Sequence, residues 1–498
     1  MRPFKTGIIR ETLAGYPCTG RGYGVLKVMK KETIAAISTG MTNSGIGIVR
    51  ISGEDAFAVA DRVYRGKQRL SDAESHTIHY GHIIDSGETV DEVLVMAMRS
   101  PRTFTGEDTI EINCHGGTFV VRRVLETVLK NGARPAEPGE FTKRAFLNGK
   151  MDLSQAEAVI DVINSENEYA LQSSISQLKG SIKNKINDIR NKIIYHTAFI
   201  ESALDDPEHI EIDGYADTLL EAAEEIIHDL EEMISSADNG RVIREGINTV
   251  ILGKPNAGKS SLLNVLAGHE RAIVTDIEGT TRDILEEQIR LGDLSLNVID
   301  TAGIRQTEDV IEKIGVDRAM EYAGKADLII YVVDASREID ENDEKILPLI
   351  KDKNTVILLN KSDLDTVVTE EMIKKKAGSI CSGFPEEGET KKEIPVISIS
   401  AKEEKGIEKL EKKLKEMFLN GIVSFNNQIC ISNVRQKNAL ADAEESMKKV
   451  VESINAGMPE DFYSIDLMDA YEALGSITGE SVGEDLVNEI FSKFCMGK

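Results

Sequence analysis

The spacing of hydrophobic positions along this 498-residue chain changes several times. From Thr33 to about Asn148, short apolar runs are separated by turns rich in glycine and proline. Segments 45–52 and 93–98 have the composition of buried strands. We therefore predict a mixed α+β domain of roughly 120 residues at this end of the chain.

The next region has the three-to-four spacing of a helix face. Its apolar positions are Ile175, Leu178, Ile182, Ile186, Ile189 and Ile193. This spacing predicts a long packed helix or a helical hairpin. Helical spacing returns after residue 421, at Leu440, Met447, Val451 and Ile454. Because each region alone would leave an apolar stripe unburied, we predict one all-α domain interrupted by the segment between them.

The intervening segment contains five apolar runs that do not alternate with polar residues. They span residues 248–252, 296–299, 328–333, 355–359 and 395–399. Such runs are typical of parallel strands covered on both faces, as in a doubly wound α/β domain. The predicted domains are 29–148 (α+β), 149–245 (helical, first part), 246–421 (inserted α/β) and 422–498 (helical, second part).

The first 28 residues form a separate leader. They carry five basic residues and one acidic residue, without an apolar stretch typical of a secretory signal. An organellar transit peptide is one interpretation, and an upstream start codon before Met29 is the other. We favour the late start because organised sequence begins near Thr33.

Composition narrows the function classes. The chain has 59 Lys and Arg against 85 Asp and Glu, a formal charge of −26, which argues against a surface that clamps nucleic acid throughout. Fourteen of the acidic residues lie in 201–238, a stretch without Lys or Arg that we expect to be a loop and a solvated helix face. Five scattered cysteines favour a reducing, cytoplasmic location over a disulfide scaffold. No run approaches the 18 apolar residues of a membrane helix, so we expect no membrane partner.

The segment from Gly253 to Ser260 matches a phosphate-binding loop and directly follows an apolar run. Backbone N–H groups of such a loop surround phosphates, Lys259 would reach the β- and γ-phosphates, and the Ser260 hydroxyl would bind Mg²⁺.

Three further motifs follow strands of the same domain in order. They are Asp300-Thr301-Ala302-Gly303, Asn360-Lys361-Ser362-Asp363 and Ser400-Ala401-Lys402. The carboxylate of Asp363 can accept hydrogen bonds from guanine N1–H and N2–H₂, a donor pair that adenine lacks. Together the motifs predict a GTP-binding domain resembling the translation-factor-related GTPases.

The predicted switch segments are less ordinary. Ile304 stands where many GTPases have a glutamine that orients the attacking water, so Arg305, Glu308 and Glu312 become candidates for that role. Segment 279–283 is the switch I candidate, with Thr281 as a Mg²⁺ ligand. The amide oxygen of Asn256 could bind a monovalent cation beside the phosphates, replacing the charge of an arginine finger.

The chain as a whole resembles one family. Segments 45–53, 104–111, 115–117 and 138–153, the inserted GTPase domain and the C-terminal 494–498 are similar to the MnmE (TrmE) family of tRNA uridine-5-carboxymethylaminomethyl modification GTPases. The resemblance covers residues 33–498. Met496 is a mild departure, since the family usually has Ile or Leu there.

The resemblance implies a potassium-stimulated GTPase. It implies a homodimer, and a heterotetramer with the flavoprotein MnmG (GidA), which carries the FAD. Together the two proteins would add a carboxymethylaminomethyl or aminomethyl group at C5 of the wobble uridine of certain tRNAs. The one-carbon unit would come from a tetrahydrofolate derivative, 5-formyl-tetrahydrofolate.

The resemblance also assigns residues. K⁺ would be held by Asn256, Thr275, Ile277 and Thr280, and Glu312 would orient the water. The folate would be contacted by Arg50, Glu111, Lys150 and Lys498. Catalytic roles are expected for Lys259, Arg282 and Glu312; Cys495 is either a nucleophile or a packed small hydrophobe. The expected nucleotide-binding set is Asn256, Ala257, Gly258, Lys259, Ser260, Ser261, Thr275, Asp276, Ile277, Glu278, Gly279, Thr280, Thr281, Asp300, Thr301, Ala302, Gly303, Asn360, Lys361, Ser362, Asp363, Ser400, Ala401 and Lys402.

Two other GTPase classes and one metal site are alternative interpretations of the sequence. A ribosome-assembly GTPase would carry a basic RNA-binding appendage, and a dynamin-like GTPase would carry a membrane-binding segment; neither is evident in the sequence. His76, His79 and His82 could suggest a metal site. Since residues three apart in a strand point to opposite faces, we expect these imidazoles not to converge.

Overall fold

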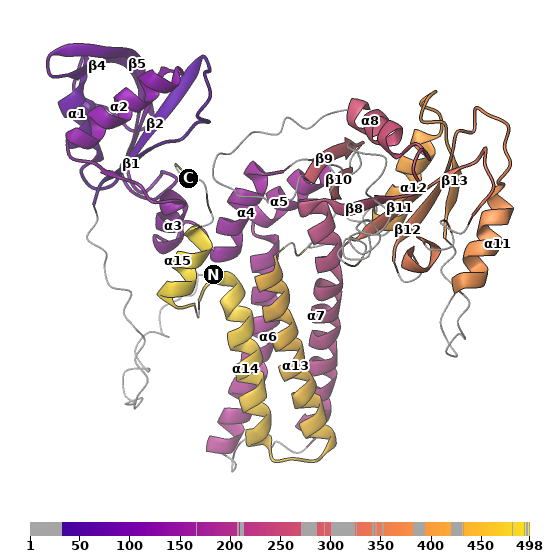
Figure 1. Cartoon of the computed structure of the whole chain (residues 1–498). Coiled ribbons are helices and arrows are strands. Elements are labelled where there is room, and N and C mark those ends of the chain that lie inside the picture. Colours follow the sequence, from indigo (N-terminus) through magenta and orange to yellow (C-terminus); the bar gives the residue numbers. More distant parts are fainter. Residues whose placement is uncertain are drawn as a thin grey trace, which may run out of the picture. The chain divides into compact units, whose positions relative to one another are not determined.

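A computed structural model describes most of the chain (Figure 1). The described residues are 32–165, 167–206, 209, 214–269, 286–292, 294–299, 324, 326–340, 343, 346–350, 353–381, 394–419, 431, 433–480, 482–492, 494 and 497. Their contacts form two compact units. The first comprises the described residues of Met1–Lys150 and Gly483–Lys498, and the second comprises those of Met151–Val482. The prediction places all of 422–498 in the helical domain, whereas by their contacts the described residues from Gly483 onward group with the first unit.

The first unit is built on a seven-stranded sheet in the order β3-β4-β5-β6-β2-β1-β7. Its strands are β1 (Ile34–Ile37), β2 (Ile46–Ser52), β3 (Tyr64–Gly66), β4 (Thr77–Asp85), β5 (Glu88–Met98), β6 (Thr109–His115) and β7 (Arg134–Pro135). Its helices are α1 (Ala56–Val63), η1 (Leu70–Asp72), α2 (Thr118–Lys130), α3 (Glu140–Leu147) and α15 (Glu484–Ser492). The strand segments predicted at 45–52 and 93–98 are confirmed as β2 and part of β5.

The sheet of the first unit has two different faces. Alternate residues of β2, β5 and β6 pack with α1 and α2 in one apolar core, which includes Val49, Val95 and Ile112. On the other face a small cluster joins Ile34 of β1 to Phe141 of α3. Helix α3 therefore covers only the β1 end of that face.

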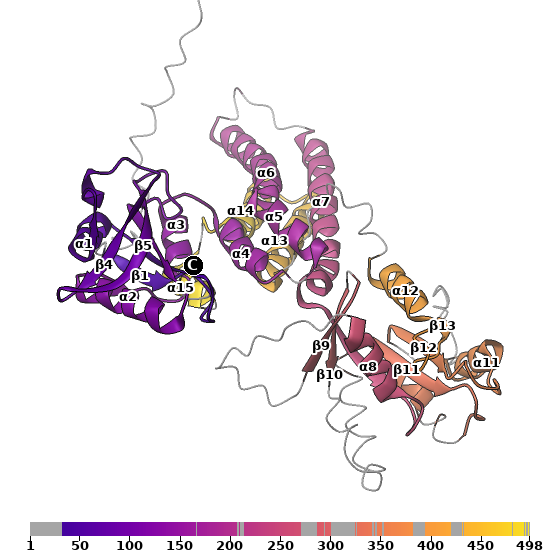
Figure 2. The same cartoon turned by 90° about the horizontal axis from the view of Figure 1, so that it is seen from above.

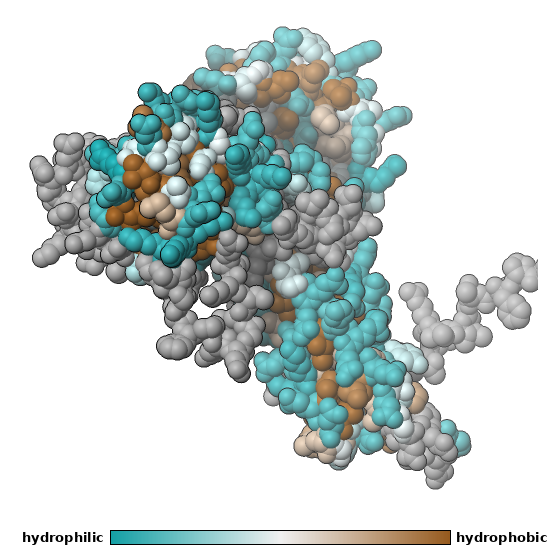
Figure 3. Space-filling view, turned by 90° about the vertical axis from the view of Figure 1, so that its right-hand side faces the viewer, coloured by the Kyte–Doolittle hydropathy of each residue, from teal (hydrophilic) through white to brown (hydrophobic). Residues whose placement is uncertain are grey.

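The second unit contains a helical bundle and a sheet domain. The bundle consists of α6 (Ser181–Asp205), α7 (Tyr215–Glu245), α13 (Val434–Asn455) and α14 (Glu460–Thr478), preceded by α4 (Leu153–Ile163) and α5 (Glu168–Leu178). One apolar core joins α6 and α7 to α13 and α14, from both sides of the insertion (Figure 2). The prediction of one interrupted helical domain is therefore confirmed. In Figure 3, hydrophobic side chains form a narrow strip along the bundle between hydrophilic ones, as amphipathic helices require.

The inserted domain has a six-stranded sheet in the order β13-β12-β11-β8-β10-β9. The strands are β8 (Ile247–Leu252), β9 (Glu286–Leu291), β10 (Leu294–Ile299), β11 (Leu328–Asp334), β12 (Thr355–Asn360) and β13 (Val396–Ser398). The helices are α8 (Lys259–His269), η3 (Leu347–Ile350), α11 (Glu370–Cys381) and α12 (Ile407–Leu419). All five predicted strands are present and parallel; the antiparallel edge strand β9 was not predicted.

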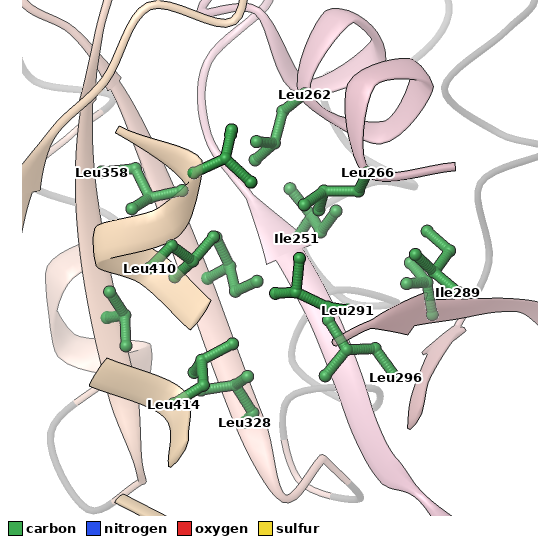
Figure 4. Close-up of a cluster of buried hydrophobic side chains, with 14 of the residues drawn as sticks. Ile251, Leu262, Leu266, Ile289, Leu291, Leu296, Leu328, Leu358, Leu410 and Leu414 are labelled. Atoms are coloured by element: carbon green, nitrogen blue, oxygen red, sulfur yellow. The ribbon is translucent and has the colours of Figure 1, made fainter. Parts of the chain in front are cut away.

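Both faces of this sheet are covered, as predicted. On one face, leucines of α8 and α12, such as Leu262 and Leu410, pack onto Ile251 and Leu358 of the strands (Figure 4). On the other face, Ile373 of α11 packs with the opposite side chains of β11 and β12. This doubly wound arrangement brings the carboxyl ends of the parallel strands to one edge. Within the described residues, no helix combines the length and apolarity needed to cross a bilayer.

Candidate functional site

The phosphate-binding loop lies between the end of β8 and the start of α8, at the carboxyl edge of the sheet. Helix α8 begins at Lys259 itself, so its first backbone N–H groups are free of intrahelical partners and suited to an anion. Ser260, the predicted Mg²⁺ ligand, is exposed at this helix start. Asn256 is exposed and has a left-handed backbone with φ of 63°.

Lys259 is folded back over its own loop. Its Nζ donates to the carbonyl oxygens of Gly253 at 2.5 Å and Lys254 at 2.8 Å. Burial lowers the pKa of the Lys259 amine to about 8, because a charged group loses hydration there without gaining a carboxylate partner. The loop thus holds the Lys259 ammonium group at its centre, where it donates hydrogen bonds to two backbone carbonyl oxygens.

Asn360 joins three of the sequence motifs. It ends β12 and is 2% exposed. Its Nδ2 donates to the carbonyl oxygen of Ala257 at 2.8 Å, and its Oδ1 accepts from the N–H of Ala401 at 3.0 Å. One buried side chain therefore connects the phosphate-binding loop with the motifs at 360–363 and 400–402.

Asp363 has the properties needed to recognise guanine. The Ser400 hydroxyl donates to Asp363 Oδ1 at 2.6 Å, and this hydrogen bond lowers the pKa of the Asp363 carboxyl. The side chain remains exposed. An ionised, oriented and exposed carboxylate can accept hydrogen bonds from two N–H groups of a guanine base.

Two contributors to this site were not found from the sequence. Asp334 ends the buried strand β11 and pairs with Nζ of Lys361 at 2.6 Å. Burial acts to raise the pKa of the Asp334 carboxyl, but hydrogen bonds from Lys361 and Ser336 outweigh it and lower that pKa. An acidic residue closing a fully apolar strand at the carboxyl edge was the available signal.

The other contributor is Asp343, which is 1% exposed. It lies 2.6 Å from Nζ of Lys254 and accepts the hydroxyl hydrogen of Tyr331 at 2.7 Å. This buried contact fixes the second residue of the phosphate-binding loop to the sheet. No local motif marks Asp343, because its partner lies 89 residues earlier in the chain.

Several predicted residues lie outside the described part of the chain, and their roles stay predictions. They are Thr275, Asp276, Ile277, Glu278, Gly279, Thr280, Thr281, Arg282, Asp300, Thr301, Ala302, Gly303, Ile304, Arg305, Glu308, Glu312, Cys495 and Lys498.

A second candidate site lies in the first unit, on the sheet face next to α3. Arg50 of β2 and Glu111 of β6 are direct neighbours in the ladder, and Arg50 Nε lies 2.7 Å from Glu111 Oε1. The Arg50 guanidinium also lies over the rings of Phe104 and Phe141, at 5.8 and 5.6 Å from their centroids. Lys150, the third predicted residue, donates to the carbonyl of Pro101 at 3.0 Å, on the loop that carries Phe104. Arg50 and Glu111 are thus brought together, with Lys150 on an adjoining loop.

Buried ion pairs fix the two motifs that surround this site. Arg144 of α3 lies 3.0 Å from Glu107 and 2.9 Å from Glu140, and all three side chains are at most 12% exposed. Burial acts to raise the pKa of the Glu140 carboxyl, but hydrogen bonds from Arg134 and Arg144 lower it overall. Segments 104–111 and 138–153, which are distant in sequence, are therefore held against each other.

The three histidines engage different neighbours. His76 Nδ1 is hydrogen-bonded to the Ser75 hydroxyl at 2.8 Å, and His79 Nε2 to the Thr77 hydroxyl at 2.7 Å. His82 packs edge-on against the ring of Tyr80. The described residues contain no group of three metal-ligating side chains.

Fold and site define a P-loop protein of the GTPase class, in which a doubly wound domain is inserted into a helical bundle. Family models match along nearly the whole chain: the MnmE helical domain over residues 153–495 and the GTP-binding protein TrmE N-terminus over residues 33–150. The chain therefore belongs to the MnmE family.

Curated relatives match the chain over most of its length. The protein named tRNA modification GTPase MnmE from Lachnoclostridium phytofermentans is 56% identical over 473 residues, covering 94% of this chain and 100% of the relative. Proteins of the same name from Acetivibrio thermocellus and Geobacillus kaustophilus are 50% and 45% identical, over 94% of this chain and at least 99% of theirs.

Proposed function

We propose that the protein hydrolyses GTP as part of the modification of tRNA. The observation that carries the GTP assignment is the site built by Asn360, in which Lys259 follows β8 and Asp363 follows β12 at the same carboxyl edge of the sheet. Membership of the MnmE family supports the assignment to tRNA modification.

We propose that the same site binds two cations, Mg²⁺ and K⁺. Ser260 and Thr281 would hold Mg²⁺, and Asn256, Thr275, Ile277 and Thr280 would hold K⁺. When bound, these cations neutralise charge on the phosphates. The described residues that fit these roles are the exposed Ser260 at the start of α8 and the exposed, left-handed Asn256 in the loop before it.

Hydrolysis gives the first test. GTP turnover should be many-fold faster in KCl than in NaCl at equal ionic strength, and equal rates would remove K⁺ from the proposal.

Glu312→Ala should abolish turnover while leaving GTP binding intact, whereas Glu308→Ala, its neighbour in the same segment, should keep turnover. We propose that Arg282 also has a catalytic role in GTP hydrolysis.

The first unit is proposed to bind 5-formyl-tetrahydrofolate through Arg50, Glu111, Lys150 and Lys498. Support comes from the paired, partly exposed Arg50 and Glu111 beside two phenyl rings, which suit a ligand with both an aromatic ring and carboxylates. Glu111→Ala should weaken binding of this folate in a fluorescence titration. Glu126→Ala, an exposed acid on α2, is the matched control. Unchanged affinity in Glu111→Ala would overturn the folate site.

The reaction requires partners. We propose a homodimer that joins the flavoprotein MnmG, the carrier of FAD, in a heterotetramer acting on the wobble uridine of cytoplasmic tRNAs. Residues 151–498 carry 38 Lys and Arg against 68 Asp and Glu, so their net charge opposes binding of an RNA backbone, and the partner would supply most of the grip on RNA. Cys495 remains a candidate nucleophile.

Nucleoside analysis of tRNA tests the whole proposal. A deletion strain should lose the C5 substituent of the wobble uridine and regain it with the wild-type gene. A Lys259→Ala gene should not restore it. Wild-type modification in the deletion strain would overturn the tRNA assignment, and co-sedimentation with a ribosomal subunit would support a ribosome-assembly GTPase instead.

A further inference from the structure

The C-terminal segment of the chain packs onto the N-terminal domain. Phe491 of α15 and Phe494 are buried, and their ring centroids lie 5.1 Å apart. Both approach Gly139 at the start of α3, where an added methyl group would come too close to the carbonyl of Phe491 and the ring of Phe494. Nζ of Lys143 on α3 donates to Asn488 of α15 at 2.6 Å. Helix α3 is thus the surface on which the segment is seated.

Beyond Phe494, the chain is held at Gly497 by the end of β1. Its carbonyl oxygen accepts from the Ser38 hydroxyl at 3.0 Å and from Nη1 of Arg50 at 3.3 Å. Gly497 is buried and has φ of 90°, and a methyl group there would overlap the carbonyl oxygen of Ile37. The backbones therefore approach so closely that this position requires glycine.

These contacts connect the tail to the second candidate site. Arg50 donates through Nη1 to Gly497 and through Nε to Glu111, so one guanidinium joins the tail to the carboxylate of that site. Ser38 adds the only other hydrogen bond to Gly497 among those found in the described residues. Among the described residues, the Ser38 hydroxyl donates to Gly497 and Glu111 pairs with Arg50, so Ser38 can be changed without removing either member of the Arg50–Glu111 pair.

We infer that Ser38 is a positioning residue: by holding the carbonyl of Gly497 it keeps the C-terminal tail on Arg50 and sets the binding competence of the Arg50–Glu111 site. The effect on the Arg50–Glu111 site rests on the proposed folate function, whereas the retention of the tail by Ser38 does not. Lys498 is covalently bonded to Gly497, so a tail released from Ser38 also releases the last residue of the proposed folate set.

Release of the C-terminal lysine measures the tail without any ligand. The full-length chain is incubated with a carboxypeptidase specific for C-terminal Lys and Arg, and removal of Lys498 is followed by mass spectrometry. Ser38→Ala should release Lys498 about three- to tenfold faster than wild type, the factor expected for one lost hydrogen bond. Ser38→Thr keeps the hydroxyl and should restore the wild-type rate.

Two further variants make the result specific. Ser44→Ala removes a hydroxyl of the same domain that donates to Ile46 instead, and it should behave as wild type. Gly497→Ala should release Lys498 faster than Ser38→Ala, because both the backbone conformation and the close approach are lost. Equal rates in wild type and Ser38→Ala, or an equal increase in Ser44→Ala, would overturn the inference.

A titration with 5-formyl-tetrahydrofolate tests the second half. Ser38→Ala and Gly497→Ala should both weaken binding, with Ser38→Thr restoring it, while the thermal transition of the first unit stays unchanged in Ser38→Ala. Faster release of Lys498 with unchanged folate affinity would overturn the role of Ser38 in the site. If the wild-type chain binds no folate, the proposed function of this site fails, and the lysine-release rates still decide whether Ser38 holds the tail.

Discussion

Lys259 is a single residue in which charge and surroundings oppose each other. Its amine is buried between carbonyl oxygens without a carboxylate, and its pKa falls to about 8. The folded pKa lies below the unfolded value of 10.5, so the unfolded chain binds more protons between about pH 8 and 10.5. This lysine therefore makes the nucleotide-free protein more stable as pH rises through that window.

Nucleotide binding should reverse this shift. Phosphate oxygens beside Nζ favour the charged amine, so GDP binding at pH 8 should take up about half a proton per site. Isothermal titration in buffers of different ionisation enthalpy measures this uptake. At pH 6.5, where the amine is already charged, the uptake should vanish. Heats that do not depend on the buffer at pH 8 would contradict the role assigned to Lys259.

Base selectivity also belongs to one residue. Asp363→Asn replaces an acceptor by a donor opposite the guanine N–H groups, and it should weaken GDP binding by at least about 100-fold while favouring xanthosine diphosphate. Competition with a fluorescent nucleotide gives both affinities. Asp365→Asn, two residues away and exposed, is the matched control and should bind GDP as wild type does. Retained guanine preference in Asp363→Asn would show that the pocket lies elsewhere.

At the scale of elements, the predicted apolar stripe of the helical region is interrupted. Helix α5 ends at Leu178 and α6 begins at Ser181, with Gly180 between them at φ of 92°. Ile182, Ile186, Ile189 and Ile193 are all buried in the bundle core, whereas Leu178 is exposed. Periodicity identified the helix face correctly, but the break depends on a left-handed residue that spacing does not reveal.

Substitution of Gly180 tests this break. Gly180→Ala should lower the free energy of unfolding of the second unit by about 1–2 kcal/mol, because a left-handed conformation is costly for a residue with Cβ. An added methyl group has room there, the nearest atom being Nε2 of Gln155 at 3.6 Å. Gly180→Asn should lose less, since asparagine tolerates this conformation better. Urea denaturation gives the order, and equal stability of all three proteins would mean that α5 and α6 are continuous.

Strand β9 and the position of helix α15 were also not predicted from the sequence. Strand β9 has the polar composition Glu-Glu-Gln-Ile-Arg-Leu and alternates at the sheet edge, so it lacks the continuous apolar run that identified its parallel neighbours. Helix α15 has an ordinary amphipathic pattern, and only its contacts with α3 assign it to the first unit. Local pattern identifies an element but does not say which core it joins.

At the scale of the whole molecule, many of the acidic residues behind the net negative charge lie on helix α7. The acidic residues of α7 face lysines of neighbouring helices. Asp229 lies 2.8 Å from Lys185, Glu225 lies 2.7 Å from Lys192, and Glu231 lies 3.7 Å from Lys448. The expected solvated helix face is therefore in part a seam of ion pairs. Each exposed pair contributes little by itself, but together they remove part of the repulsion within the bundle.

Two compact units imply two independent responses to ligand. Since the nucleotide site lies in the second unit, GDP with Mg²⁺ at 100 times its dissociation constant should stabilise that unit by about 2.7 kcal/mol and leave the first unchanged. Glu140→Gln should lower only the transition of the first unit, because it removes a buried carboxylate that pairs with both Arg134 and Arg144. Calorimetry resolves the two transitions. A shift of both transitions by GDP would show that the units unfold together.

The sequence by itself determined the fold class of each domain and predicted four nucleotide-binding motifs, because apolar spacing and short contiguous motifs are local properties of a chain. It also singled out Arg50 and Glu111, though only through a resemblance. Tertiary structure alone decided that Asp343 supports the phosphate-binding loop and that Gly497 lies on Ser38 and Arg50. These contacts join residues 89, 459 and 447 positions apart. No local pattern encodes such pairs, since they exist only once separate strands and helices have packed around shared cores.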